Sequence, residues 1–176
     1  MNIDVKIIRK NLNEYMDAQL KRGEYEEKMR EAFSKIKTKL SFLLLPSEDP
    51  KLRSIKYCEW GDIYFEFKRY SDSLLSKYFT WSQEGRDLVK PAIIEILLFL
   101  KLKKEHEKQN RQVHELERNF ETEIMEKLDL YRRNTKLRNI WIPISRQVEV
   151  DVEKTKGAKK ELAEISDEEL LKMKRS

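Results

Sequence analysis

Glycine and proline are scarce in this chain, which has only four of each among its 176 residues. These two residues supply most of the backbone conformations of tight turns, so their scarcity argues for long helices and against many turns. The glycines also stand singly, whereas a phosphate-binding loop needs clustered glycines to let the backbone approach the phosphates. No catalytic motif is present either. We therefore predict neither a cofactor nor enzymatic activity.

Cysteine occurs once, at Cys58, so the chain can form no internal disulfide and no thiolate zinc site of its own. A packed thiol is the better interpretation of this residue, because no base can be placed beside it. Histidine occurs twice, at His106 and His114. On one helix they would lie about 12 Å apart, too far to share a metal ion. We predict two solvated histidines and no metal site.

Long apolar runs are also missing. The most apolar stretch, at 92–100, is nine residues long and contains Glu95, whereas a membrane-spanning helix needs about 20 apolar residues. The first ten residues are too charged to be the apolar core of a secretion signal. We predict a cytoplasmic protein without membrane contact, in which 92–100 is a core segment.

Helical periodicity dominates what is present, and it predicts a mainly α fold. Apolar residues recur at helical spacing from Ile8 to Leu20 and again from Tyr25 to Leu40. Gly23 lies between the two stretches, where a left-handed residue would end the first helix. The pattern predicts an N-terminal hairpin of two antiparallel helices joined at this glycine.

The segment 55–68, IKYCEWGDIYFEFK, fits two different periods. A β-hairpin with its turn at Gly61 and Asp62 gives strands with one apolar and one amphipathic face. A helix capped by Asp62 aligns Ile63 and Phe67 instead. We favour the hairpin because the residues after the turn have high β propensity.

The stretch from Leu88 to Leu137 has no glycine or proline after Pro91. Its middle, 103–112, carries no apolar side chain, so one continuous helix and two helices joined by a loop both fit. An amphipathic face of the coiled-coil kind follows, and it would pack on the N-terminal helices or on another chain. Its apolar residues are Val113, Leu116, Phe120, Ile124, Leu128 and Tyr131.

Near the C-terminus the pattern changes to that of a strand. Pro143 is expected to prevent a helix, and three valines from Val148 to Val152 alternate with polar residues. This predicts a strand at 146–152. The strand would pair with the 55–68 hairpin in a small β element, or with another protein.

The last segment, 154–176, is predicted to lie outside the 1–153 domain, as a charged linker and a short tethered helix. Ser166 and Glu169 have the spacing of a capping box, and Ile165 and Leu170 that of a hydrophobic staple. Lysines at the end of this helix complement its dipole. Many proteins carry a docking peptide in this way, and the alternative is a helix that folds back on its own domain.

Positive charge is concentrated in 130–146, which has five basic residues and no acidic one in a chain of net charge +5. Arginine binds phosphate through paired N–H groups, and aromatic rings stack on exposed bases. The alternative is a basic helix end that complements the dipole. The candidate nucleic-acid contacts are Arg132, Arg133, Lys136, Arg138, Arg146, Tyr131 and Trp141.

These patterns predict a non-enzymatic adaptor or assembly subunit of a larger complex that acts on nucleic acid. Protein partners are expected, and self-association stays open. The alternative is direct DNA or RNA binding by 130–146, largely independent of sequence. The residues expected to contact a protein partner are Leu116, Phe120, Ile124, Leu128, Ile165, Leu170 and Leu171.

Overall fold

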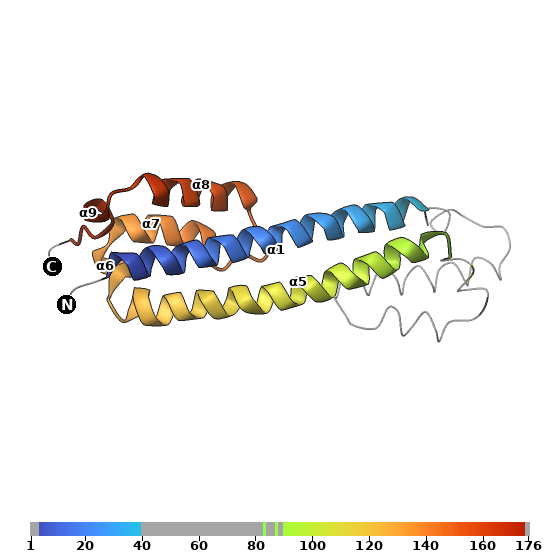
Figure 1. Cartoon of the computed structure of the whole chain (residues 1–176), viewed down its shortest axis with the longest axis horizontal. Helices are drawn as coiled ribbons and strands as arrows, with labels where there is room; N and C mark the ends of the chain where they lie inside the picture. The colour runs from blue at the N-terminus through green and yellow to red at the C-terminus, as the bar shows by residue number, and fades with distance from the viewer. Residues whose placement is uncertain (1–3, 40–82, 84–86, 88–89, 175–176) are drawn as a thin grey trace. The chain divides into compact units, whose positions relative to one another are not determined.

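The computed structural model describes residues 4–39, 83, 87 and 90–174, and in them the chain is mainly helical (Figure 1). None of these described residues belongs to a β-strand. The mainly α fold class is therefore confirmed. The helices are α1 (Val5–Lys39), α5 (Ile93–Phe120), α6 (Leu130–Arg133), α7 (Thr135–Ile144), α8 (Val152–Glu164) and α9 (Asp167–Leu170), with a 3-10 turn at Lys90–Ala92 and a π-helix at Glu121–Glu126.

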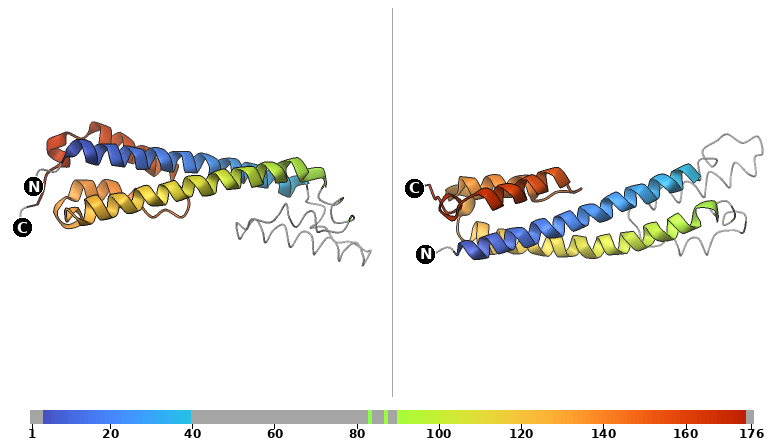
Figure 2. Two further views of the ribbon diagram at one scale, coloured as in Figure 1. Left: turned by 60° about the horizontal axis from the view of Figure 1, so that its bottom comes forward. Right: turned by 45° about the horizontal axis from the view of Figure 1, so that its top comes forward.

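The chain divides into two compact units, which we call unit 1 (residues 1–26 and 106–176) and unit 2 (residues 27–105). In unit 1, α7 and α8 lie side by side (Figures 1 and 2). Its core centres on Trp141, which is fully buried. The Trp141 ring lies 4.8 Å from that of Tyr15 and 4.5 Å from that of Phe120, centroid to centroid. Aromatic packing thus joins α1, the end of α5 and α7.

The helical hairpin predicted at Gly23 is wrong, because α1 continues through this residue to Lys39. Gly23 is buried, and a Cβ atom on it would come within 3.0 Å of Val152 Cγ2 and 3.2 Å of Val150 Cγ1. Glycine costs about 1 kcal/mol in a helix relative to alanine. Here it admits the valines of a distant segment to the helix surface, which explains its presence inside a helix.

The strand predicted at 146–152 is also wrong. Arg146 has a φ of 55°, which is left-handed and incompatible with an extended strand. Asp151 then caps α8, since its side chain accepts a hydrogen bond of 3.0 Å from Lys154 N. The valine alternation instead separates Val150, which packs on Gly23, from Val148, which is 92% exposed. The predicted hairpin at 55–68 lies outside the described residues.

Pro143 does not prevent a helix, because it lies inside α7, next to the last residue. A proline there removes a single helical hydrogen bond. The helix is held by the burial of four large side chains on its inner face, which outweighs that loss. These are Leu137, Ile140, Trp141 and Ile144.

One continuous helix, rather than two with a loop, runs through the polar stretch 103–112 as part of α5. Gln109 explains how unit 1 accommodates this stretch: it is 6% exposed, and its Nε2 donates a hydrogen bond of 3.1 Å to Ala18 O. After the π-helix the chain reverses at Asp129, whose φ of 52° is left-handed. The long helix therefore ends before Leu137.

The charged linker predicted at the start of 154–176 is wrong, because residues 154–164 belong to α8. The buried positions of α8 are Thr155, Ala158 and Leu162, and only the leucine is strongly apolar. The sequence of this segment therefore shows no clear helical pattern of apolar residues. The cap at Ser166 forms as predicted, with Oγ accepting from Glu169 N at 3.2 Å. Leu170 is nevertheless fully buried in the core of unit 1, so α9 folds back on the domain and is not tethered.

Unit 2 includes the last part of α1 and the first part of α5. Phe33 and Phe99 face each other with ring centroids 6.5 Å apart, and Lys39 pairs with Glu95. The run 92–100 is only partly core. Ile96 and Phe99 are buried, whereas three other side chains are exposed: Ile94 at 74%, Leu97 at 44% and Leu98 at 47%. Among the described helices, none combines the length and apolar character that a membrane crossing requires.

Candidate nucleic-acid interface

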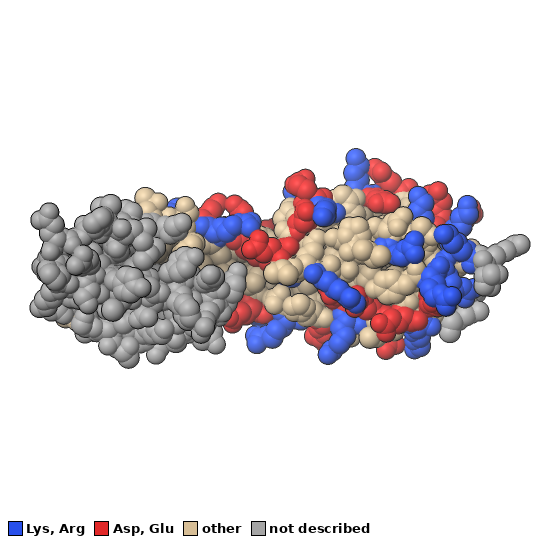
Figure 3. Space-filling model, turned by 180° about the vertical axis from the view of Figure 1, so that it is seen from behind, with Lys and Arg blue, Asp and Glu red and all other residues tan. Residues whose placement is uncertain are grey.

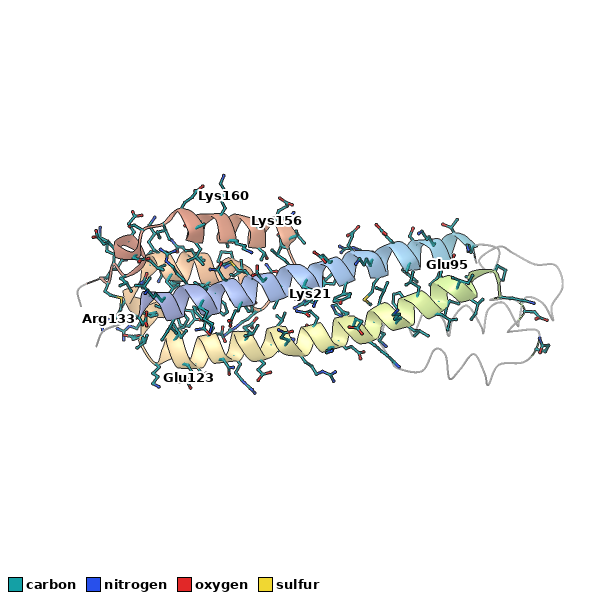
Figure 4. All side chains as sticks on the ribbon, in the orientation of Figure 1. Lys21, Glu95, Glu123, Arg133, Lys156 and Lys160 are labelled. Atoms are coloured by element: carbon teal, nitrogen blue, oxygen red, sulfur yellow. The ribbon has the colours of Figure 1, made fainter. Side chains whose placement is uncertain are left out.

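The junction of α6 and α7 presents three of the predicted basic residues to solvent. Arg132, Arg133 and Lys136 are all exposed. The turn between the helices is fixed by Asn134, which is fully buried and whose Oδ1 accepts a hydrogen bond of 2.9 Å from Leu137 N. These basic side chains therefore extend from a rigid part of unit 1, whose end carries Arg133 in Figure 4.

Two lysines from the end of the chain join this surface. Lys174 N donates a hydrogen bond of 2.7 Å to Arg133 O, and Asn134 Nδ2 donates one of 2.5 Å to Leu170 O. Both Lys172 and Lys174 are exposed. Sequence reasoning missed them because only the return of α9 to α6 brings them there. We define the basic cluster as Arg132, Arg133, Lys136, Lys172 and Lys174.

The side chains of the basic cluster are not held in ion pairs within the described residues. The carboxylate of Asp167, at the start of α9, is paired with Arg9, at 2.8 Å from its Nε. Figure 3 shows Lys and Arg side chains gathered at this end of unit 1. An anion that approaches the cluster would therefore displace no ion pair of the protein.

Arg138 and Arg146 do not belong to the cluster. Arg146 Nε lies 3.3 Å from Glu121 Oε1, and its backbone N–H donates to Glu117 Oε2 at 3.1 Å. The hydrogen bond to Glu121 raises the pKa of Arg146. Arg138 Nη1 donates to Tyr131 O at 3.2 Å and is half-buried. The structure thus engages two of the five predicted basic residues internally.

The two predicted stacking residues are structural. Trp141 lies in the core, and its Nε1 donates a hydrogen bond of 3.0 Å to the Tyr131 hydroxyl. That hydroxyl donates in turn to Glu121 Oε1 at 3.2 Å. Burial raises the pKa of Tyr131, as expected for a partly enclosed phenol. The indole ring is therefore not available to a base.

The residues predicted to contact a protein partner lie in the core of unit 1 instead. The apolar stripe begins at Val113 on α5 and continues past the end of that helix to Tyr131 on α6. It packs in the core of unit 1 with residues of α1 and α7, and packing within the chain was one of its two open interpretations. Phe120, Ile124, Ile165 and Leu170 are buried. Partly buried against the same core are Leu116, Leu128 and Leu171.

A second polar arrangement, which sequence reasoning missed, holds the connection between α7 and α8. Arg22 is 2% exposed, and its Nε lies 2.9 Å from Glu26 Oε1. Its Nη2 donates to Gln147 O at 3.0 Å and also to Val148 O. We call Arg22 and Glu26, with the backbone they bind, the polar clamp. It ties a connection without regular structure to α1.

Glu26 completes the polar clamp. Its Oε2 accepts a hydrogen bond of 2.9 Å from Val150 N, and its Oε1 lies 3.2 Å from His106 Nε2. Burial raises the pKa of Glu26, but the hydrogen bonds from His106, Val150 and Arg22 outweigh it, so the net direction is downward. His114 is exposed as predicted, whereas His106 is only partly exposed because of this contact.

No group of three histidine, cysteine or acidic side chains in the described residues is placed to hold a metal ion. No protein-family model matches this chain, and neither a curated protein nor a solved structure shows significant similarity to it. Function is therefore inferred from the surfaces and contacts of the chain itself.

Proposed function

We propose that this protein binds nucleic acid directly and without regard to its sequence, through the basic cluster. The observation that carries the proposal is the hydrogen bond between Lys174 N and Arg133 O, which joins two basic segments far apart in the chain. The cluster is exposed and free of ion pairs in the described structure. Cationic side chains of this kind bind phosphates and release condensed counterions.

The size of the electrostatic contribution follows from the number of cations. If all five side chains of the cluster contact phosphates, the slope of log affinity against log salt is about −4.5 for a duplex. Affinity would then fall about 500-fold between 50 and 200 mM salt. A shallower slope would mean that fewer side chains take part.

The test is a salt series of fluorescence anisotropy with two labelled DNA duplexes of unrelated sequence. The variant combines Arg132→Glu, Arg133→Glu and Lys174→Glu. We expect it to lose binding to both duplexes equally and to flatten the salt slope by about 3.

A control variant changes the net charge by the same amount at Lys21, Lys156 and Lys160, which lie on α1 and α8 (Figure 4). The three control lysines are also replaced by glutamate. If the control variant loses as much affinity as the cluster variant, net charge alone accounts for binding and the proposal fails.

An assembly subunit is the second candidate function, and one observation favours it. Ile94, Leu97 and Leu98 are exposed at neighbouring positions on α5, and adjacent exposed apolar side chains are typical of contact surfaces. Sedimentation over a range of protein concentrations tests this for contact with a second copy. We expect replacement of all three by glutamine to abolish association. A wild-type chain that stays monomeric throughout would contradict contact between copies.

A further inference from the structure

Resting on the proposed function, we infer that the basic cluster selects double-stranded nucleic acid over single strands. The juxtaposition that points to this is a rigid group of cations beside which the described residues offer no exposed aromatic ring. A duplex and a single strand are bound by different kinds of protein surface. A duplex presents its phosphates at high density on a rigid frame, whereas a flexible single strand is held largely by stacking of its bases on aromatic side chains.

The aromatic side chains nearest in sequence to the basic residues on α6 and α7 are engaged in contacts within unit 1. Trp141 is fully buried between Tyr15 and Phe120. The Tyr131 hydroxyl accepts from Trp141 and donates to Glu121, so its partly buried ring is held in place. Across the described residues, no phenylalanine, tyrosine or tryptophan is exposed. Within the described structure, a base that left its stack would therefore find no exposed ring at this surface.

The amide beside the cluster is also turned inward. Asparagine side chains can read adenine through paired hydrogen bonds. Asn134, between Arg133 and Lys136, instead accepts from Leu137 N and donates to Leu170 O, and none of it is exposed. It therefore contributes rigidity rather than recognition of a base.

The same two contacts hold the cations in place. Lys174 N binds Arg133 O, and Asn134 Nδ2 binds Leu170 O, so both backbone segments of the cluster are fixed to each other. A preorganised surface loses less conformational entropy when it meets a rigid ligand. Backbone phosphates of a duplex are such a ligand, and their counterions are released more completely than those of single strands.

The expected preference can be estimated from counterion release. The salt slope is about −0.9 per contacted phosphate for a duplex and about −0.7 for a single strand. For five contacts the slopes are about −4.5 and −3.5, so affinities that are equal at 1 M salt differ about tenfold at 0.1 M. We therefore expect the duplex to bind about tenfold more tightly at 0.1 M salt.

The experiment measures binding of the full chain to a mixed-sequence DNA duplex and to an oligothymidine strand of the same length, at several salt concentrations. A tighter and more salt-dependent duplex complex supports the inference. Equal affinity for both, lost in the cluster variant, overturns the duplex preference but leaves the proposed function standing. Binding of neither ligand at low salt overturns both.

Vesicles of phosphatidylserine and phosphatidylcholine, an anionic membrane surface, are added as a competitor of the duplex. If they displace the duplex at equal phosphate concentration, the cluster binds anionic surfaces in general and the inference fails. A second variant with Arg132→Gln, Arg133→Gln and Lys174→Gln guards against an effect of introduced negative charge. Its circular dichroism melting curve should match that of the wild type, because all three side chains are exposed.

Discussion

Removal of the Glu26 carboxylate is expected to destabilise unit 1 strongly. Arg22 is 2% exposed, and Glu26 Oε1 lies 2.9 Å from its Nε. Glu26→Ala leaves a buried guanidinium without its counter-charge and removes the acceptor of Val150 N–H. Breaking a buried ion pair from one side typically costs about 3–5 kcal/mol, and we expect the free energy of unfolding to fall by that amount.

Urea unfolding followed by circular dichroism measures the change, and Glu164→Ala is the matched control. Glu164 lies 3.9 Å from Lys160 in an ion pair whose side chains are 68% and 78% exposed. Exposed pairs contribute about 0–1 kcal/mol, so this control should unfold almost like the wild type. If Glu26→Ala costs no more than Glu164→Ala, the polar clamp does not hold the connection as described.

A double variant separates an unpaired charge from a lost contact. Replacing both partners by apolar residues, Arg22→Met with Glu26→Leu, removes the buried charge entirely. Such replacements of buried pairs are often neutral or stabilising. We expect the double variant to unfold at a higher urea concentration than Glu26→Ala alone. The opposite order would refute the reasoning about desolvation.

Three further predictions concern unit 1. Gly23→Val should lower the free energy of unfolding, measured in urea, by about 1–3 kcal/mol, because the new side chain overpacks against Val152. Gly157→Ala should raise the free energy of unfolding by about 0.5–1 kcal/mol, because an added Cβ there meets nothing within 4 Å. Equal effects of the two substitutions would contradict the close contact at Gly23. The pKa of Glu26 in the folded chain lies below its usual value of 4.5. The stability that the Glu26 carboxylate contributes is therefore complete above pH 4.5 and is lost as the pH falls through the pKa of the folded chain. Glu26→Gln should show a flatter dependence of stability on pH. Trp141→Ala should lower the free energy of unfolding, measured in urea, by about 3–5 kcal/mol. Little or no loss would indicate that the indole is a surface ring.

Local patterns predicted the helices where the apolar spacing was strong. The first half of α1, the stretch around Phe120 and the cap at Ser166 all follow from spacing or capping chemistry within a few residues. Gly23 misled because a glycine that ends a helix and one that admits a neighbouring side chain are identical in sequence. Only the position of Val152, remote along the chain, distinguishes them.

Only those residues of the candidate site that lie close together in the sequence could be predicted. The acid-free segment indicated Arg132 and Arg133, and both are exposed. Lys174 could not be assigned to the same surface, because its contact with Arg133 depends on the return of α9. Trp141 was misjudged for a related reason: its indole N–H finds a partner in the Tyr131 hydroxyl, which lets the ring enter the core.

Unit 1 is assembled from two separate segments, residues 1–26 and 106–176, and this separation constrains its order of folding. Arg9 binds Asp167 across 158 residues of sequence, and residues 27–105 lie between the two parts of the unit. The inner face of α1 in unit 1 is synthesised before residues 27–105, and its contacts with α7 cannot form until that helix has emerged from the ribosome. Closing so long a loop is entropically costly and slows folding. During synthesis the part of α1 that belongs to unit 1 therefore has an incomplete core until α7 and α8 have been made.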